Sequence, residues 1–135
     1  MSHFTRVRTA LREPDLLVQA LAAVGFTTVE THDTPQTLYG YQGDARPEQA
    51  EVIIRRRHIG SDSNDIGFRR RDDGTFEAVI SEYDRSRYDQ PWLTKVAQAY
   101  GHAAALRYAT DNGYEVDSDV LEDNGQRRLV LRRYT

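Results

Sequence analysis

The 135-residue chain contains no cysteine, which excludes a disulfide framework, a thiolate nucleophile and any metal or cluster held by cysteine. Residues 1–6 lack the apolar segment of a secretory signal. No apolar run approaches the roughly 20 residues that a membrane helix needs. These absences predict a cytoplasmic protein without a membrane partner.

Lysine is almost missing as well. Lys95 is the only lysine among 18 basic residues, and the other seventeen are arginines. Arginine is the better residue for planar, bidentate pairing with carboxylate or phosphate, although GC-rich coding sequences also favour it. The formal net charge is −3, whereas domains that bind nucleic acid without sequence preference are usually clearly basic. The composition therefore weighs against a general polyanion binder.

Signatures of catalysis are also absent. The serines lack a nucleophile elbow, and the glycines form neither a Walker loop nor a dinucleotide fingerprint. Residues 62–67 look like the first half of a calcium loop, but Ile66 stands where an oxygen ligand is required. No two histidines have metal-binding spacing; the four are His3, His32, His58 and His102. We therefore expect no catalytic residue, no metal and no cofactor.

The chain does contain a pattern that occurs twice: an apolar helix, a glycine stop, an aromatic residue and then strands. Its glycine and aromatic pairs are Gly25-Phe26 and Gly113-Tyr114. A chain of this length fits one domain. We predict a single α+β domain over residues 1–135, a two-layer sandwich with two helices packed on one face of an antiparallel sheet. The repeated pattern predicts an approximate internal duplication that relates residues 1–57 to residues 75–135.

Apolar periodicity predicts helices over residues 16–24 and 92–109, with Pro14 and Pro91 near their first turns. Asp72-Asp73-Gly74, between two alternating runs, is a strong hairpin signal. Segments 31–37 and 43–49 each contain a proline and are predicted as loops. The predicted strands are 3–9, 26–30, 38–42, 51–57, 65–71, 75–83, 114–121 and 128–134.

Four stretches occur together in a specific order: the opening Ser-His-Phe-Thr, Tyr39-Gly40-Tyr41-Gln42-Gly43, Asp65-Ile66-Gly67-Phe68-Arg69 and Leu129-Val130-Leu131-Arg132-Arg133-Tyr134. Over nearly the whole chain, this order resembles the conserved hypothetical chloroplast reading frame number thirty-five family of cyanobacterial and plastid proteins. The resemblance implies a domain of unknown function with no assigned catalytic residues. Because members sometimes accompany AAA-type ATPases, it also implies such an ATPase as a partner.

The candidate binding surface consists of Arg55, Arg57, Arg69, Arg71, Tyr39 and Tyr41. Within the predicted strands 51–57 and 65–71 each arginine pair shares a face, so the pairs form one patch if the strands are neighbours. Tyrosines beside such a patch supply stacking surfaces for single-stranded nucleic acid. The alternative is cross-strand ion pairing with carboxylates such as Glu51 and Glu77, which the negative net charge favours.

Three functional hypotheses follow. The leading one is a non-catalytic protein-interaction or adaptor module that docks another protein or another copy of itself on the open sheet face. The alternative is a nucleic-acid-binding domain that uses the arginine and tyrosine surface. A second alternative is a small-ligand binder or enzyme with a site between helix and sheet, around His3, Tyr100 and His102.

Overall fold

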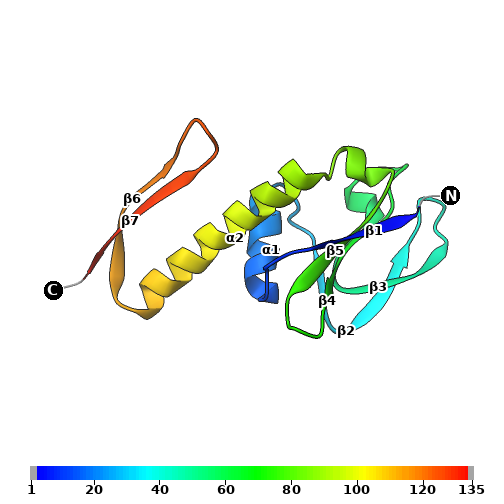
Figure 1. The fold of residues 1–135 in the computed structure, drawn as a ribbon, viewed down its shortest axis with the longest axis horizontal. Coiled ribbons are helices and arrows are strands. Elements are labelled where there is room, and N and C mark those ends of the chain that lie inside the picture. Colours follow the sequence, from blue (N-terminus) through cyan, green and yellow to red (C-terminus); the bar gives the residue numbers. More distant parts are fainter. Residues whose placement is uncertain (1–2, 134–135) are drawn as a thin grey trace.

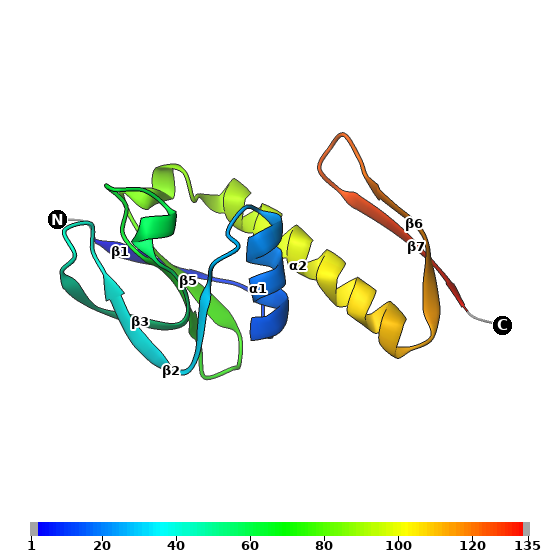
Figure 2. The same cartoon turned by 180° about the vertical axis from the view of Figure 1, so that it is seen from behind.

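The computed structural model describes residues 3–133, and its main body is a five-stranded sheet with two helices on one face (Figures 1 and 2). The strand order is β1-β5-β4-β3-β2, and every neighbouring pair is antiparallel. The predicted α+β class, with two helices packed on an antiparallel sheet, is confirmed. The strands are β1 (Phe4–Arg8), β2 (Glu30–Tyr39), β3 (Ala45–Ile54), β4 (Ile66–Arg70) and β5 (Phe76–Ser81).

The two helices begin and end where their sequence signals predict. Helix α1 (Pro14–Ala23) starts with a proline, whose missing N–H costs nothing in the first turn, and stops just before Gly25, which has a φ of +108°. Helix α2 (Gln90–Asp111) has Asp89 as its N-cap, and the Asp89 carboxylate accepts a hydrogen bond from the Trp92 N–H. No helix within residues 3–133 is long and apolar enough to cross a membrane.

An apolar core fills the space between the helices and the sheet. Alternate residues of β5 (Phe76, Ala78 and Ile80) point toward the helices, where they pack with Leu17 and Val96. These five side chains are fully buried. The body is therefore held mainly by burial of apolar surface between its two layers.

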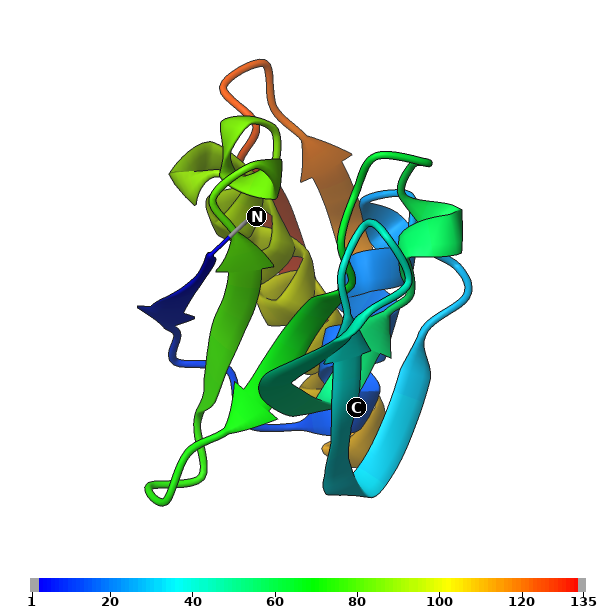
Figure 3. The ribbon, with the colours of Figure 1, turned by 90° about the vertical axis from the view of Figure 1, so that its right-hand side faces the viewer.

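The opposite face of the sheet is not bare at its centre. A second, smaller cluster there contains Leu38, Ala50, Ile53 and Val79, all fully buried. Leu38 and Ala50 come from the long β2–β3 ribbon in the strongly twisted sheet (Figure 3). The expected open docking face is therefore partly covered by the chain itself.

Two predicted loops are in fact parts of strands. Residues 31–37 lie in β2 and most of residues 43–49 lie in β3, so both loop predictions are wrong. The β2–β3 register shifts between Thr31 and Gln36, a stretch that contains Pro35, and again between Thr37 and Tyr39. A proline is tolerated where the ladder of hydrogen bonds is interrupted, and this explains the error. Conversely, residues 26–29, predicted as strand, are not in one.

The last two strands, β6 (Tyr114–Leu121) and β7 (Arg127–Arg133), form a separate two-stranded sheet. The predicted hairpin is confirmed, except that Tyr134 lies outside the described residues. The element order strand–helix–strand–strand does occur twice, but the second pair of strands does not join the main sheet. Helix α2 has 22 residues and α1 has 10, so at 1.5 Å per residue α2 is about 18 Å longer. It carries the hairpin beyond the sheet (Figure 1).

We predict that Gly67→Ala lowers the free energy of unfolding by about 2 kcal/mol, because overpacking a core typically costs 1–3 kcal/mol. A Cβ at Gly67 would stand 2.6 Å from the Cβ of Ala50 and 3.1 Å from a methyl of Leu38. The matched control is Gly101→Ala in α2, where a Cβ meets nothing within 4 Å. This control is expected to stabilise the protein by about 0.5–1 kcal/mol. Equal effects in urea unfolding would contradict the close approach at Gly67.

Candidate functional site

The antiparallel pairing of β3 with β4 separates the arginines that the sequence placed together. Val52 pairs with Phe68 and Ile54 with Ile66, so the end of β3 lies beside the start of β4. Arg55 therefore lies at one end of the sheet, and Arg69 and Arg71 lie toward the other. Arg57 is not in a strand at all, since it belongs to the 3₁₀ helix at Arg56–His58. The candidate residues form two groups rather than one patch.

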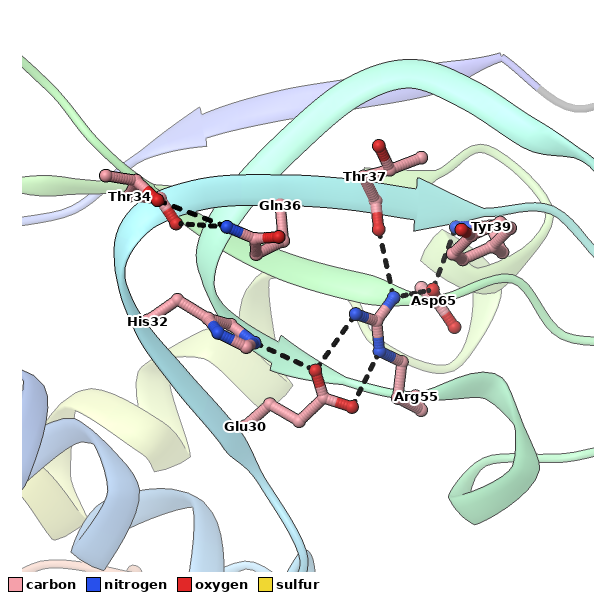
Figure 4. A network of polar contacts seen from close by, with 8 residues as sticks. All are labelled: Glu30, His32, Thr34, Gln36, Thr37, Tyr39, Arg55 and Asp65. Atoms are coloured by element: carbon pink, nitrogen blue, oxygen red, sulfur yellow. Dashed lines mark hydrogen bonds and ion pairs between the residues drawn. The ribbon is translucent and has the colours of Figure 1, made fainter.

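The first group is centred on Arg55, whose guanidinium makes four hydrogen bonds to its own chain (Figure 4). Its Nε and Nη2 donate to the two carboxylate oxygens of Glu30, both at 2.9 Å. Its Nη1 donates to the Thr37 carbonyl and to Oδ2 of Asp65, again at 2.9 Å. The guanidinium also lies 5.6 Å from the centre of the Tyr39 ring. Arg55 and Tyr39 are thus next to each other, but four of the five N–H donors of Arg55 are used within its own chain.

Asp65 is the buried anion of this group, with only 1% of its surface exposed. Besides the Arg55 contact, its carboxylate accepts hydrogen bonds from the Tyr39 N–H at 2.8 Å and the Arg56 N–H at 2.7 Å. The neighbouring Asn64 accepts one from the Tyr41 N–H at 2.9 Å. Both tyrosines of the candidate surface are therefore held through their backbones by the segment that precedes β4.

Electrostatics in this group follow from the Arg55–Glu30 pair. Hydrogen bonding to Arg55 lowers the pKa of Glu30 to about 2 and outweighs the opposing effect of burial; His32, bonded to Glu30 at 2.9 Å, adds to the lowering. The same contact raises the pKa of Arg55 above its usual value. The pair is therefore ionised at neutral pH, and the charge of Arg55 is compensated by two carboxylates.

The second group lines a shallow hollow of about 660 Å³ on the sheet face away from the helices. Arg69 and Arg71 of the candidate set lie here, together with Arg6 and Arg70. Arg6 pairs with Glu77 across the β1–β5 strand pair at 2.9 Å, which is the cross-strand ion pairing of the alternative, whereas Arg71 pairs with Asp73 of the adjoining turn at 2.9 Å. Four arginines face three carboxylates in this lining, which leaves only a small excess of positive charge.

The three residues proposed for a site between helix and sheet serve separate contacts. The Tyr100 hydroxyl accepts hydrogen bonds from the N–H groups of Arg12 and Glu13, just before α1. His102 bonds through Nε2 to Asp119 of β6 at 2.7 Å. His3 lies beside β5, where its carbonyl accepts from the Glu82 N–H. Within residues 3–133 no group of three or more His, Asp or Glu side chains is arranged to hold a metal ion.

The sequence reading missed a third surface, which we call the C-terminal arm: the second half of α2 from Tyr100 onward, together with β6 and β7. Two contacts bind its hairpin to the helix, the His102–Asp119 bond and a stack of Tyr108 on Tyr114 at 6.0 Å between ring centres. Hydrogen bonds from His102 and then Arg127 lower the pKa of Asp119. The large exposed apolar side chains of the arm are Tyr108, Val116, Val120, Leu121 and Val130.

A groove of about 580 Å³ separates the tip of the arm from the body. Leu121, which is 61% exposed, and Gly125 contribute to it from the hairpin, while Val24, Pro91 and Ala99 contribute from the helices. This lining is mainly apolar, unlike that of the arginine hollow. The sequence shows that the strands of the arm are rich in valine and leucine. It does not show that these strands lie apart from the main sheet, because that depends on tertiary placement.

We predict that Glu30→Gln lowers the free energy of unfolding at pH 7 by about 1 kcal/mol, a value reduced because the Glu30 side chain is 36% exposed. A carboxyl whose pKa falls on folding stabilises the fold above its unfolded pKa and loses this contribution as pH falls. For Glu30 the window runs from its ordinary 4.5 down to about 2. Urea unfolding of the variant should lack that part of the acid loss. Glu77→Gln is the control, because its partner Arg6 is 54% exposed, against 20% for Arg55. An identical pH profile for both variants would contradict the assignment.

Comparison with known proteins gives a family but no solved structure. The family described as "Protein of unknown function (DUF1257)" matches residues 20–130. "Uncharacterized protein ycf35" of Guillardia theta is 27% identical over 139 residues, covering 99% of this chain and 98% of the relative. The protein of the same name from Pyropia yezoensis is 22% identical with the same coverage. No solved structure matches significantly. Because the family match spans most of the chain, and the ycf35 proteins match it from end to end, the chain belongs to the DUF1257 family, which confirms the resemblance drawn from its motifs.

Proposed function

We propose that this chain is a non-catalytic protein-interaction module whose docking surface is the C-terminal arm. The observation that carries the proposal is the exposure of Val120 (51%), Leu121 (61%) and Val130 (38%) on a two-stranded sheet that no other described strand covers. Isolated two-stranded hairpins are marginally stable in water, and contiguous exposed apolar surface is typical of interaction sites. A partner that covers these side chains removes them from water and stabilises the arm.

The alternative, binding of nucleic acid through the arginines, has weaker support. Arg55 spends its donors on Glu30, Asp65 and a backbone carbonyl, and the arginines of the hollow face nearly as many carboxylates. Nucleic acid binds tightly when arginines neutralise its phosphates and so release the counterions that surround it. An arginine that is already paired with a carboxylate must give up that partner first, so it gains less. The expected AAA-type ATPase partner rests on the family resemblance alone.

The test is recovery of a partner by tagged protein purified from its own host cells with nuclease present. We expect Val120→Glu and Leu121→Glu to lose the partner, because each places a charge at the exposed apolar tip of the arm: Leu121 lines the groove beside the body and Val120 lies on the opposite side of β6. The matched controls are Arg57→Glu and Arg69→Glu, which change charge outside the arm and are expected to keep it. All four positions are at least partly exposed, so unfolding free energies should change by only about 0.5 kcal/mol.

The opposite pattern would overturn the proposal. Retention of the same protein by both arm variants means that the arm is not the docking surface. In a parallel purification without nuclease, a nuclease-sensitive partner that is lost in Arg69→Glu and released as salt rises would favour the nucleic-acid alternative instead.

A further inference from the structure

The hairpin of the arm has two different faces. The register pairs Asp119 with Leu129 and Val116 with Leu131, and the bond from Asp119 to His102 turns this side toward α2. The other side is formed by the pairs Glu115–Arg132, Ser118–Val130 and Val120–Arg128. We call this side the outer face. Its two valines are among the exposed apolar side chains of the arm, so it lacks a cover within the described chain.

Charge is divided between the two strands of the hairpin. The ionisable residues of β6 are all carboxylates, namely Glu115, Asp117 and Asp119. Those of β7 are all guanidinium groups, namely Arg127, Arg128, Arg132 and Arg133. One long edge of the hairpin is therefore acidic and the other basic, and this division limits how two copies can meet.

Two hairpins can meet symmetrically along their edges or through their outer faces. Of the arrangements that follow, only one places the acidic strand β6 of each copy against the basic strand β7 of the other. Edge-to-edge pairing of β6 with β6 sets carboxylates against carboxylates, and pairing of β7 with β7 sets arginines against arginines. A two-fold axis parallel to the strands, placed between two stacked outer faces, puts β6 of each copy over β7 of the other. Glu115, which is paired with Arg132 of its own copy, then also faces Arg132 of the second copy, with the valines between this contact and the turn.

We propose that a second copy of this chain is a partner of the arm, packed outer face to outer face about such an axis. The inference rests on the proposed function and names one occupant of its docking surface. A hairpin eight residues long and two strands wide presents about 250 Å² per copy, against about 800 Å² per partner in a standard interface. The dimer is therefore weak and forms only at high protein concentration. Its exposed charge pairs make it weaker as salt rises.

The experiment is sedimentation velocity of the full chain from about 5 μM to about 1 mM at low salt, the range over which a dimer of this strength dissociates. We expect the wild type to shift from monomer to dimer. Val130→Asp and Val120→Asp should weaken dimerisation at least tenfold. The matched control is Tyr83→Asp, on the body and away from the hairpin, where the tyrosine is also exposed; it is expected to leave dimerisation unchanged. Near-ultraviolet and far-ultraviolet circular dichroism verifies that each variant is folded.

A mixing experiment separates contacts between copies from contacts within one copy. An acidic variant, Arg128→Glu with Arg132→Glu, and a basic variant, Glu115→Arg with Asp117→Arg, should each remain monomeric. Mixed in equal amounts they should form a heterodimer, because each supplies the charge that the other lacks. Within one copy both variants carry like charges across the hairpin, so stabilisation of a single copy does not predict this result.

Three results would overturn the dimer: a monomeric wild type at about 1 mM, dimerisation unaffected by Val130→Asp, or a mixture that stays monomeric. These results differ from failure of the proposed function. If a different protein is still recovered from cells through Val120 and Leu121, the arm remains a docking surface and only its assignment to a second copy is wrong. If neither a dimer nor an arm-dependent partner is found, both proposals fail.

Discussion

The buried carboxylate of Asp65 is the constraint on which the polar end of the sheet depends. A buried charge is tolerated only when it is paired and hydrogen-bonded, and Asp65 finds its partners on three segments: the end of β2, the backbone after β3 and the guanidinium of Arg55. Arg55 in turn is held by Glu30 at the start of β2. The two ends of β2 are thus tied to the same guanidinium, and the bent β2–β3 ribbon has one arrangement in which Asp65 is satisfied. That arrangement is also what lays Leu38 over the second face of the sheet.

Contacts of the same kind occupy other arginines of the body. Arg56 reaches three backbone carbonyls, those of Tyr41, Ser61 and Ser63, and Arg70 bonds to the carbonyls of Arg12 and Gly74. A lysine ammonium has three donors at a single point, whereas a guanidinium spreads five over a plane and can join several segments at once. Arginine therefore acts here as a cross-link between loops, in addition to any bias in coding. The number of arginines in the sequence therefore includes both those that bond within the chain and those that could bind a ligand.

Local signals in the sequence predicted the elements well, and tertiary placement explains the failures. The Asp72-Asp73-Gly74 turn, Pro14, Gly25 and the last hairpin act through their own backbone geometry, so their positions could be predicted. Pro35 led to a wrong loop prediction. At a register shift a proline removes no hydrogen bond of the strand ladder, and no local sequence pattern predicts where such a shift occurs. Separation of Arg55 from Arg69 follows from the antiparallel pairing of β3 with β4, which alternation of side chains does not determine. The individual ion pairs of the hollow were predictable in kind, since carboxylates lie near arginines on neighbouring strands, but not the partners.

The length of α2 links this architecture to its proposed use. The first copy of the repeated pattern has a short helix, and its two strands return to the sheet, where they bury Leu38 of β2 and the second half of β3. In the second copy, 12 more helical residues move the equivalent strands out of reach, although those strands keep the valines and leucines that a sheet would bury. One side of the hairpin contacts α2 through His102 and Tyr108. These contacts orient the hairpin and leave its outer face in water. A hairpin of two strands is marginally stable on its own, so a partner that covers its apolar side chains also stabilises it. The longer helix thus turns strands that resemble core strands into an exposed surface for association.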